Sequence, residues 1–107
     1  SATNLANYLR TLKFPIYGIW AMTKNKDPDK FIKKFKGIFT KIVTIPIENE
    51  TAAFSNQLLF KIAKKNKYNS EKSKNFEEAL KKISSKEKKI ICCFGSLYSA
   101  GNILNKN

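Results

Sequence analysis

The sequence has no histidine, a single arginine and only two cysteines. Without histidine the chain lacks the side chain most used for acid–base catalysis near neutral pH and the commonest metal ligand. Cys92 and Cys93 are adjacent within an apolar run, so on a strand their side chains point to opposite faces. No Cys-x-x-Cys spacing is present. We therefore predict two buried thiols, no metal site and no disulfide framework.

Several catalytic motifs are also missing. There is no Walker-type phosphate-binding loop, no Gly-x-Gly-x-x-Gly, no Gly-x-Ser-x-Gly and no pair of carboxylates with the spacing that glycosidases use. We predict no catalytic residue in this chain and expect it to be inactive by itself. No apolar run approaches the roughly 20 residues of a membrane span, and no signal peptide is recognisable. We expect a cytoplasmic protein without a membrane partner.

Positive charge is abundant, with 21 basic against 8 acidic residues and a net charge of +13. Such an excess favours phosphate binding, but all the basic residues except Arg10 are lysines. Nucleic-acid recognition draws heavily on the bidentate guanidinium group, so we interpret the lysines as solvated helix faces and do not expect a nucleic-acid partner. A small basic α/β module that binds nucleic acid is the alternative function. A free-standing regulatory domain that binds a small anion is a third.

Hydrophobic periodicity predicts alternating helices and strands in a single domain, residues 1–107. Strands buried on both faces imply parallel pairing through βαβ units. The predicted fold class is α/β, a Rossmann-like and largely parallel sheet with helices on both faces. Helices are expected over 2–13, from Asp27 to Gly37, from Phe54 to Lys65, from Asn75 to Ile83 and after Gly95; strands are expected over 16–22, 41–45 and 90–94, with a short edge strand near Tyr68.

Two strand-to-helix turns are candidates for ligand binding, because ligands of such sheets gather at the carboxyl ends of the strands. One holds Lys26 and Asp27 and the other holds Gly95 and Ser96. Free N–H groups at a helix start attract anions, Gly95 permits close backbone approach, and Ser96 adds a hydroxyl. Asp27 fits a helix cap better than a catalytic carboxylate, whereas Ser96 suits capping and ligand contact equally, and the two roles are compatible. Lys26 is a solvated charge unless an anionic group faces it.

The last of these turns carries a family resemblance. Phe94-Gly95-Ser96-Leu97-Tyr98-Ser99-Ala100-Gly101 resembles the Gly-Ser-Leu-Tyr-x-Ala-Gly signature near the end of folylpolyglutamate synthase and dihydrofolate synthase, in the Mur ligase superfamily. Further stretches fit in order: Asn4 to Leu12 resembles a family helix, Ile19 to Asp27 its Gly-x-Met-x-x-Lys-Asp segment, and Thr44-Ile45-Pro46 the next strand end. The chain departs from the family at Ile19-Trp20-Ala21, Ser99 and Asn102.

The resemblance implies the C-terminal domain of an ATP- and Mg-dependent ligase. In the full-length parent, a folate or dihydropteroate carboxylate is phosphorylated and the amino group of glutamate attacks the acyl phosphate. This domain would close over the site and position substrate through Gly95, Ser96, Lys26 and Asp27. Its partner would be the N-terminal ATPase domain of the same parent chain, which would bind ATP and Mg, whereas this chain alone would bind no cofactor. The family's Asp-Gly-Ala-His-Asn strand would precede Ser1, so the first strand is expected to be missing.

Overall fold

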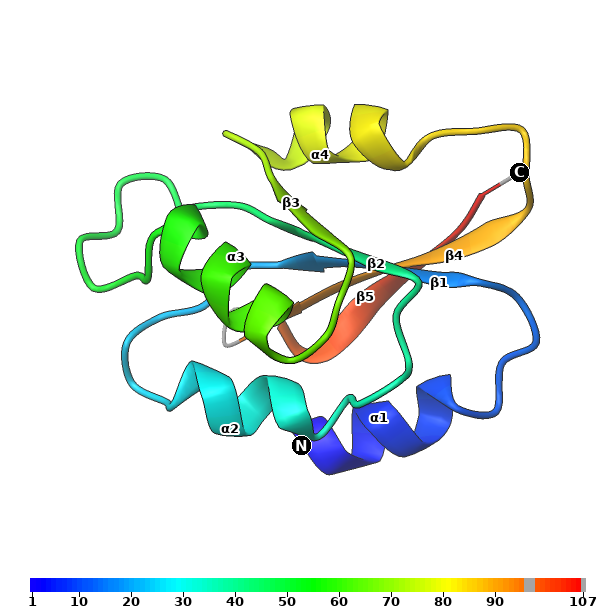
Figure 1. Cartoon of the computed structure of the whole chain (residues 1–107), viewed down its shortest axis with the longest axis horizontal. Coiled ribbons are helices and arrows are strands. Elements are labelled where there is room, and N and C mark those ends of the chain that lie inside the picture. The colour runs from blue at the N-terminus through cyan, green and yellow to red at the C-terminus, as the bar shows by residue number, and fades with distance from the viewer. Residues whose placement is uncertain (96–97, 107) are drawn as a thin grey trace.

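The chain alternates helices and strands around one five-stranded sheet (Figure 1). The computed structural model describes residues 1–95 with their side chains and the backbone of residues 98–106. The elements are α1 (Ala2–Leu9), β1 (Ile16–Trp20), α2 (Pro28–Lys33), β2 (Lys41–Thr44), α3 (Asn56–Lys65), β3 (Ser70–Lys72), α4 (Phe76–Ile83), β4 (Lys89–Gly95) and β5 (Tyr98–Lys106).

The strand order is β3-β2-β1-β4-β5. The first four strands in this order pair in parallel, and β5 pairs antiparallel with β4. In register, Gly18 of β1 lies between Ile42 of β2 and Cys92 of β4. The prediction of a largely parallel α/β sheet is confirmed. The carboxyl ends of the parallel strands point to the left in Figure 1, toward the green loop that follows β2.

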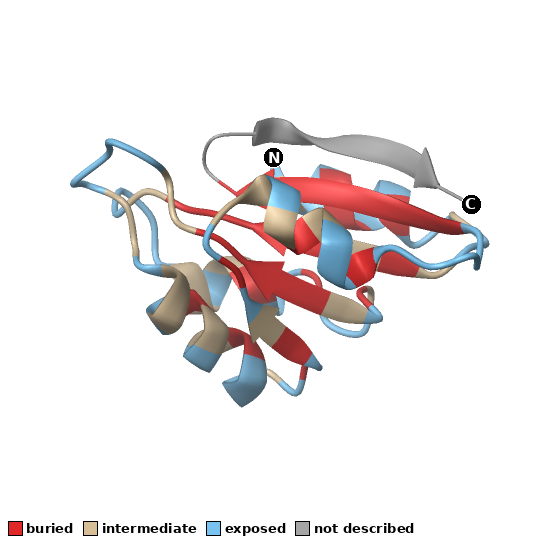
Figure 2. Cartoon of the chain, turned by 90° about the horizontal axis from the view of Figure 1, so that it is seen from above, coloured by how far each residue is buried: buried red, intermediate tan, exposed pale blue. Residues whose placement is uncertain are grey.

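Helices cover both faces of the sheet, as predicted. Helices α1, α2 and α3 contribute Leu9, Ile32 and Leu59 to the core cluster on one face. Helix α4 contributes Ala79 and Ile83 to the cluster on the other face. Figure 2 shows buried residues running through the strands, with exposed residues on the outer helix surfaces and in the loops. The two-sided burial explains why the strand sequences are apolar at successive positions.

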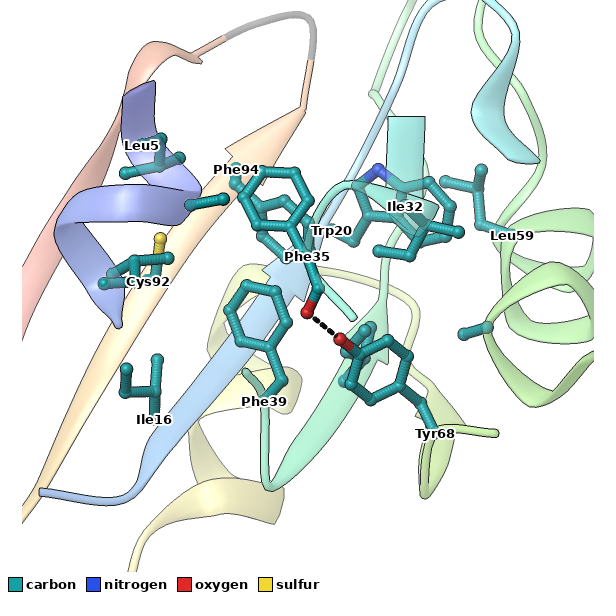
Figure 3. Packing of buried hydrophobic residues seen from close by; sticks show 14 of the residues in the cluster. Leu5, Ile16, Trp20, Ile32, Phe35, Phe39, Leu59, Tyr68, Cys92 and Phe94 are labelled. Carbon is teal, nitrogen blue, oxygen red and sulfur yellow. Dashed lines mark hydrogen bonds between the residues drawn. The ribbon is translucent and has the colours of Figure 1, made fainter. Parts of the chain in front are cut away.

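Aromatic rings fill the larger cluster (Figure 3). Phe94 is fully buried, and its ring centroid lies 4.6 Å from that of Phe39, 5.2 Å from that of Phe35 and 6.0 Å from that of Trp20. The Tyr68 hydroxyl donates a hydrogen bond to the Phe35 carbonyl. Burial raises the pKa of Tyr68, so the phenol is neutral and can donate this bond. These contacts join β4 to the segments around α2.

Helix starts are set by local capping groups. The Asp27 carboxylate accepts hydrogen bonds from the N–H groups of Asp29 and Lys30, and Pro28 occupies the first turn of α2. The Asn75 side chain accepts from the N–H of Glu78 at the start of α4. Both caps were predicted from the sequence. Asp27 therefore has a structural role whatever else it contacts.

Replacing the α4 cap gives a direct measure of its contribution. We expect Asn75→Ala to lower the free energy of unfolding by about 1 kcal/mol, because the N–H of Glu78 loses its 2.8 Å acceptor. Urea denaturation followed by circular dichroism measures the loss. Asn75→Asp should retain most of the stability, since its carboxylate can accept the same bond. Equal losses in both variants would contradict a capping role.

Several predicted elements differ from the structure. Helix α2 ends at Lys33 instead of Gly37, because the chain continues in turns to Gly37, whose φ of +76° is not helical. Strand β1 ends at Trp20 instead of residue 22.

The expected helix after Gly95 is wrong: residues 98–106 form strand β5, which pairs with β4 and supplies the partner that its outer edge would otherwise lack. Helix α1 ends at Leu9 instead of residue 13, because the chain turns through Arg10 to reach β1. Tyr68 precedes the edge strand β3 and is buried under the aromatic cluster.

No helix among the described residues is long and apolar enough to cross a membrane.

Candidate functional site

The carboxyl end of β4 lies directly against the carboxyl end of β1. Gly95 has a φ of +132°, and a Cβ at this position would lie 1.7 Å from the Ala21 carbonyl oxygen. The N–H of Ala21 donates to the Phe94 carbonyl at 3.3 Å. Only glycine fits here, because both the backbone conformation and the space exclude a side chain. The structure thus brings the predicted Gly95 turn onto the end of the strand that leads to Lys26 and Asp27.

A buried donor adjoins this contact. The Trp20 side chain is fully buried, and its indole N–H has no hydrogen-bond partner within the described part of the chain. Its Cδ1 atom, bonded to the nitrogen, lies 3.4 Å from the position of a Cβ on Gly95. The nitrogen therefore lies near the turn at the end of β4.

The other predicted site residues lie as follows. Lys26 and Asp27 are exposed in the loop between β1 and α2, where Asp27 caps the helix. Within residues 1–95, no hydrogen bond or ion pair joins either residue to Gly95. Ser96 lies outside the described residues.

The loops after β1 and β2 are tied to each other. Thr23 and Ala53 form an isolated antiparallel bridge, the N–H of Lys24 donates to Ala52 O at 2.7 Å, and that of Phe54 donates to Met22 O at 2.9 Å. These bonds satisfy backbone groups that would otherwise need water. The pairing fixes the loop that carries Lys24 and Lys26 at the carboxyl edge, beside the green loop at the left of Figure 1.

A hollow of about 380 Å³ opens at the same edge, between the ends of β1 and β2 and the start of α4. Ala21 belongs to its wall and also contacts Gly95, so the hollow adjoins the turn at the end of β4. It is lined by Ala21, Ile45, Pro46, Ile47, Glu48, Asn75, Phe76 and Glu77. An apolar wall with a few polar groups at this place in an open α/β sheet is where ligands bind.

The charge of the hollow is opposite to that of the chain. Glu48 and Glu77 line it, and no basic residue is among the described residues of its wall. Both carboxylates belong to exposed residues, Glu48 after β2 and Glu77 in the first turn of α4. A ligand group with N–H donors or a positive charge suits this lining better than an anion does. The anion binding predicted for the two turns at this edge therefore does not extend to the lining of this hollow.

Sequence reasoning missed most of the hollow. Glu48 stands in a polar segment without a recognisable motif, and Asn75 and Glu77 indicate only a helix start. The signal available was position: Glu48 follows β2, and the Asn75 cap follows β3, so both stand at the carboxyl edge of a parallel sheet. What the sequence could not supply was the distance between the two segments, which depends on how α4 crosses the sheet.

The two cysteines take no part in the site. Burial raises the pKa of Cys92 to about 12 and that of Cys93 to about 11. Each thiol therefore stays protonated and unreactive at neutral pH. Cys92 packs into the cluster under α1–α3, and Cys93 into the cluster under α4.

This burial predicts the outcome of thiol titration. At pH 8 in native buffer we expect negligible reaction of either cysteine with a thiol-specific disulfide reagent over minutes. In 6 M guanidinium chloride both thiols should react at once. Rapid stoichiometric labelling of the native chain would show that β4 is accessible and would contradict the core described above.

Comparisons of the chain with protein-family models, with curated proteins and with solved structures found no match.

Proposed function

We propose that this chain is the C-terminal, substrate-positioning domain of an ATP-dependent ligase that adds glutamate to folate or dihydropteroate through an acyl phosphate. The observation that supports this most is the placement of the Gly95 turn. The turn opens the segment that resembles the folate-ligase signature, and it lies against Ala21 at the carboxyl edge of the sheet, beside the hollow. In open α/β sheets this is the ligand-binding edge.

The chemistry requires a nucleophilic amine. In the proposed reaction the γ-phosphoryl group of ATP is transferred to a substrate carboxylate, the amino nitrogen of glutamate attacks the acyl carbon, and inorganic phosphate leaves. The bound ammonium group must lose one proton to free the nucleophilic lone pair, and the nitrogen loses a second as the amide bond forms; water and the departing phosphate can accept these protons. The carboxylates of Glu48 and Glu77 suit the role of holding the incoming ammonium group by charge-assisted hydrogen bonds, which would orient it before attack.

The carboxylates of glutamate need cations, and the neighbouring loop carries them. Lys24 and Lys26 are exposed on the loop that follows β1, and that loop is anchored to residues 52–54. An amino acid has both charges, so an acidic hollow next to a basic loop matches its polarity. The chain would act in the cytoplasm, where its substrates would be met.

ATP and Mg belong to the parent's N-terminal ATPase domain in this proposal. The residues of this chain do not fit them: the sequence has no phosphate-binding loop, and no group of three or more potential metal ligands occurs within the described residues. The contribution of this chain would be to bind and orient, which lowers the entropic cost of bringing the reactants together.

A binding comparison tests the proposed role of the hollow. We expect L-glutamate at millimolar concentration to shift the amide resonances of Ala21, Glu48 and Asn75 in the 107-residue chain. N-acetyl-L-glutamate should not, because it has both carboxylates and no ammonium group. Glu48→Gln/Glu77→Gln should abolish the shifts, whereas Glu87→Gln, an exposed carboxylate outside the hollow, should leave them unchanged.

Equal shifts with the two ligands would show that the ammonium group is not recognised and would contradict this use of the hollow. Shifts that persist in the Glu48→Gln/Glu77→Gln variant would show that these carboxylates do not bind the ligand, and would also contradict this use of the hollow.

A further inference from the structure

A second hollow lies away from the carboxyl edge, between the C-terminal ends of α2 and α3. Its volume is about 370 Å³. The segments around it lead into the amino ends of β2 and β3, so it is separate from the site proposed for glutamate. Ile32 and Tyr68 form an apolar floor, and Lys33, Lys36, Lys65 and Lys67 are in the wall.

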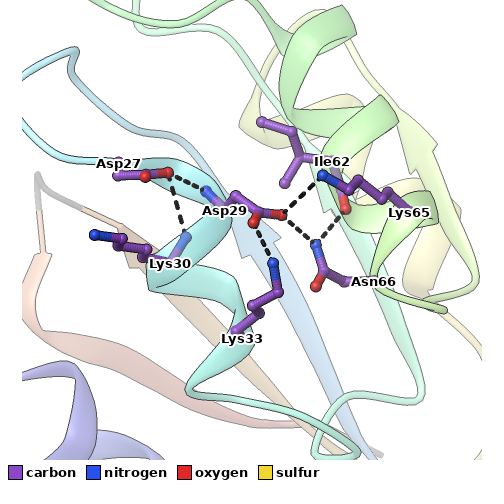
Figure 4. A network of polar contacts seen from close by, with 7 residues as sticks. All are labelled: Asp27, Asp29, Lys30, Lys33, Ile62, Lys65 and Asn66. Carbon is purple, nitrogen blue, oxygen red and sulfur yellow. Dashed lines mark hydrogen bonds and ion pairs between the residues drawn. The ribbon is translucent and has the colours of Figure 1, made fainter.

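A single carboxylate, that of Asp29, forms ion pairs with lysines of this group (Figure 4). Asp29 forms ion pairs with Lys33 and, at 3.9 Å, with Lys65, and it accepts a hydrogen bond from the Asn66 amide at 3.0 Å. The hydrogen bond from Lys33 is the main cause of the lowered pKa of Asp29, which is therefore ionised at neutral pH. Four ammonium groups against one carboxylate leave an excess of three positive charges.

Hydrogen bonding of the lysines to helix-terminal carbonyls does not account for this excess. Lysines often stand at helix C-termini because they complement the unpaired carbonyl groups there. Here other groups occupy those carbonyls. In α2 the N–H groups of Phe35 and Lys36 donate to the carbonyls of Ile32 and Lys33, and in α3 the N–H groups of residues 66–68 donate to the carbonyls of Ile62, Ala63 and Lys64. Lys36 and Lys67 have no ion-pair or hydrogen-bond partner for their ammonium groups among the described residues.

The backbone at Lys67 adds a second indication. Its φ of 72° is in the left-handed region, directly after the C-cap residue of α3, where glycine is preferred. A lysine there costs stability relative to glycine. Residues held in such conformations are found at ligand-binding positions, where the side chain repays the strain in function.

We propose that this hollow binds a phosphate group of a small organic phosphate, with the apolar part of the ligand against Ile32 and Tyr68. Lys36 and Lys67 are the primary contacts, because their ammonium groups are unpaired. Lys33 and Lys65, held by Asp29, also line the hollow. A phosphate dianion matches an excess of positive charge around an apolar floor better than a carboxylate does. The same phosphate chemistry also occurs in nucleic acid, and the experiment separates these sources.

The test uses the 107-residue chain labelled with ¹⁵N at constant ionic strength, titrated separately with pyrophosphate, with AMP and with a short single-stranded oligonucleotide. We expect saturable shifts of the amides of Lys36, Lys67 and Tyr68. Lys36→Gln/Lys67→Gln should weaken binding about tenfold. The matched control is Lys81→Gln/Lys86→Gln, which removes the same charge from exposed positions on or after α4, the helix on the other face of the sheet. It should leave the affinity within twofold.

A single variant separates binding from stability. Lys67→Gly should raise the midpoint of thermal unfolding, because glycine accepts the left-handed conformation, and it should still weaken pyrophosphate binding. AMP binding at least as tightly as the oligonucleotide identifies a small phosphate as the ligand, and tighter oligonucleotide binding with the same dependence on Lys36 and Lys67 identifies the phosphate of nucleic acid. Shifts spread over all surface lysines, or equal weakening in the control variant, would overturn the proposal.

Discussion

Gly95→Ala is expected to destabilise the chain by about 3 kcal/mol or more. Alanine at a φ of +132° is strained, and its Cβ would lie 1.7 Å from the Ala21 carbonyl oxygen. Because that oxygen belongs to the backbone, the ends of β1 and β4 must move apart to admit a methyl group. Urea denaturation followed by the fluorescence of Trp20, the single tryptophan and an immediate neighbour, measures the loss.

Gly37→Ala is the matched control for this substitution. Gly37 also has a positive φ, of +76°, but no atom lies within 4 Å of the position of its Cβ. Alanine there should cost only about 1–2 kcal/mol, the penalty of the left-handed conformation. An equal loss of stability in the two variants would show that the close contact between Gly95 and Ala21 contributes nothing to the cost. It would contradict the described packing of the end of β4 against the end of β1.

Phe94→Ala is the second large expected effect. The Phe94 ring is fully buried and touches four other aromatic rings: Trp20, Phe31, Phe35 and Phe39. Removing the ring leaves a cavity beneath α2 and also removes buried apolar surface. We therefore expect the free energy of unfolding to fall by about 3–5 kcal/mol. Chemical denaturation at two or more protein concentrations measures this loss and excludes self-association.

Two further variants bracket that result. Phe94→Leu retains much of the volume and should cost less than half as much, which keeps the measurement possible if the alanine variant does not fold. Phe14→Ala removes a ring that is 43% exposed and contacts the Lys88 ammonium group at 4.6 Å, so its cost should stay below about 1 kcal/mol. A Phe14 effect as large as that of Phe94 would contradict the described core.

Features with local causes could be predicted from the sequence. Asp27-Pro28 and Asn75 carry the groups that cap a helix within a few residues, and the structure has both caps. The strands around Gly18 and Cys92 are apolar on both faces, which is what a sheet covered on both sides requires. Local chemistry and hydrophobic periodicity thus sufficed for the fold class and for the order of elements up to β4.

Features that depend on contacts between distant segments could not be predicted from the sequence. Strand β5 contains residues that also suit a helix. It forms a strand because it pairs with β4, whose backbone N–H and C=O groups would otherwise be unpaired along that edge. Lys89 looks like a surface charge in the sequence but is buried, with its ammonium group 2.7 Å from the Ile83 carbonyl and 5.0 Å from the centre of the Tyr17 ring. The acidic hollow joins Glu48 to Glu77 across the sheet, a proximity that no local pattern encodes.

Glutamate ligation by the full-length parent tests the proposed function most directly. With ATP, Mg²⁺, L-glutamate and either dihydropteroate or tetrahydrofolate, we predict a product longer by one glutamate residue and release of one inorganic phosphate for each amide bond formed. The Glu48→Gln/Glu77→Gln form of the same protein should raise the KM for glutamate and leave the KM for ATP unchanged. A well-folded parent that forms no such product from either substrate would contradict the proposal.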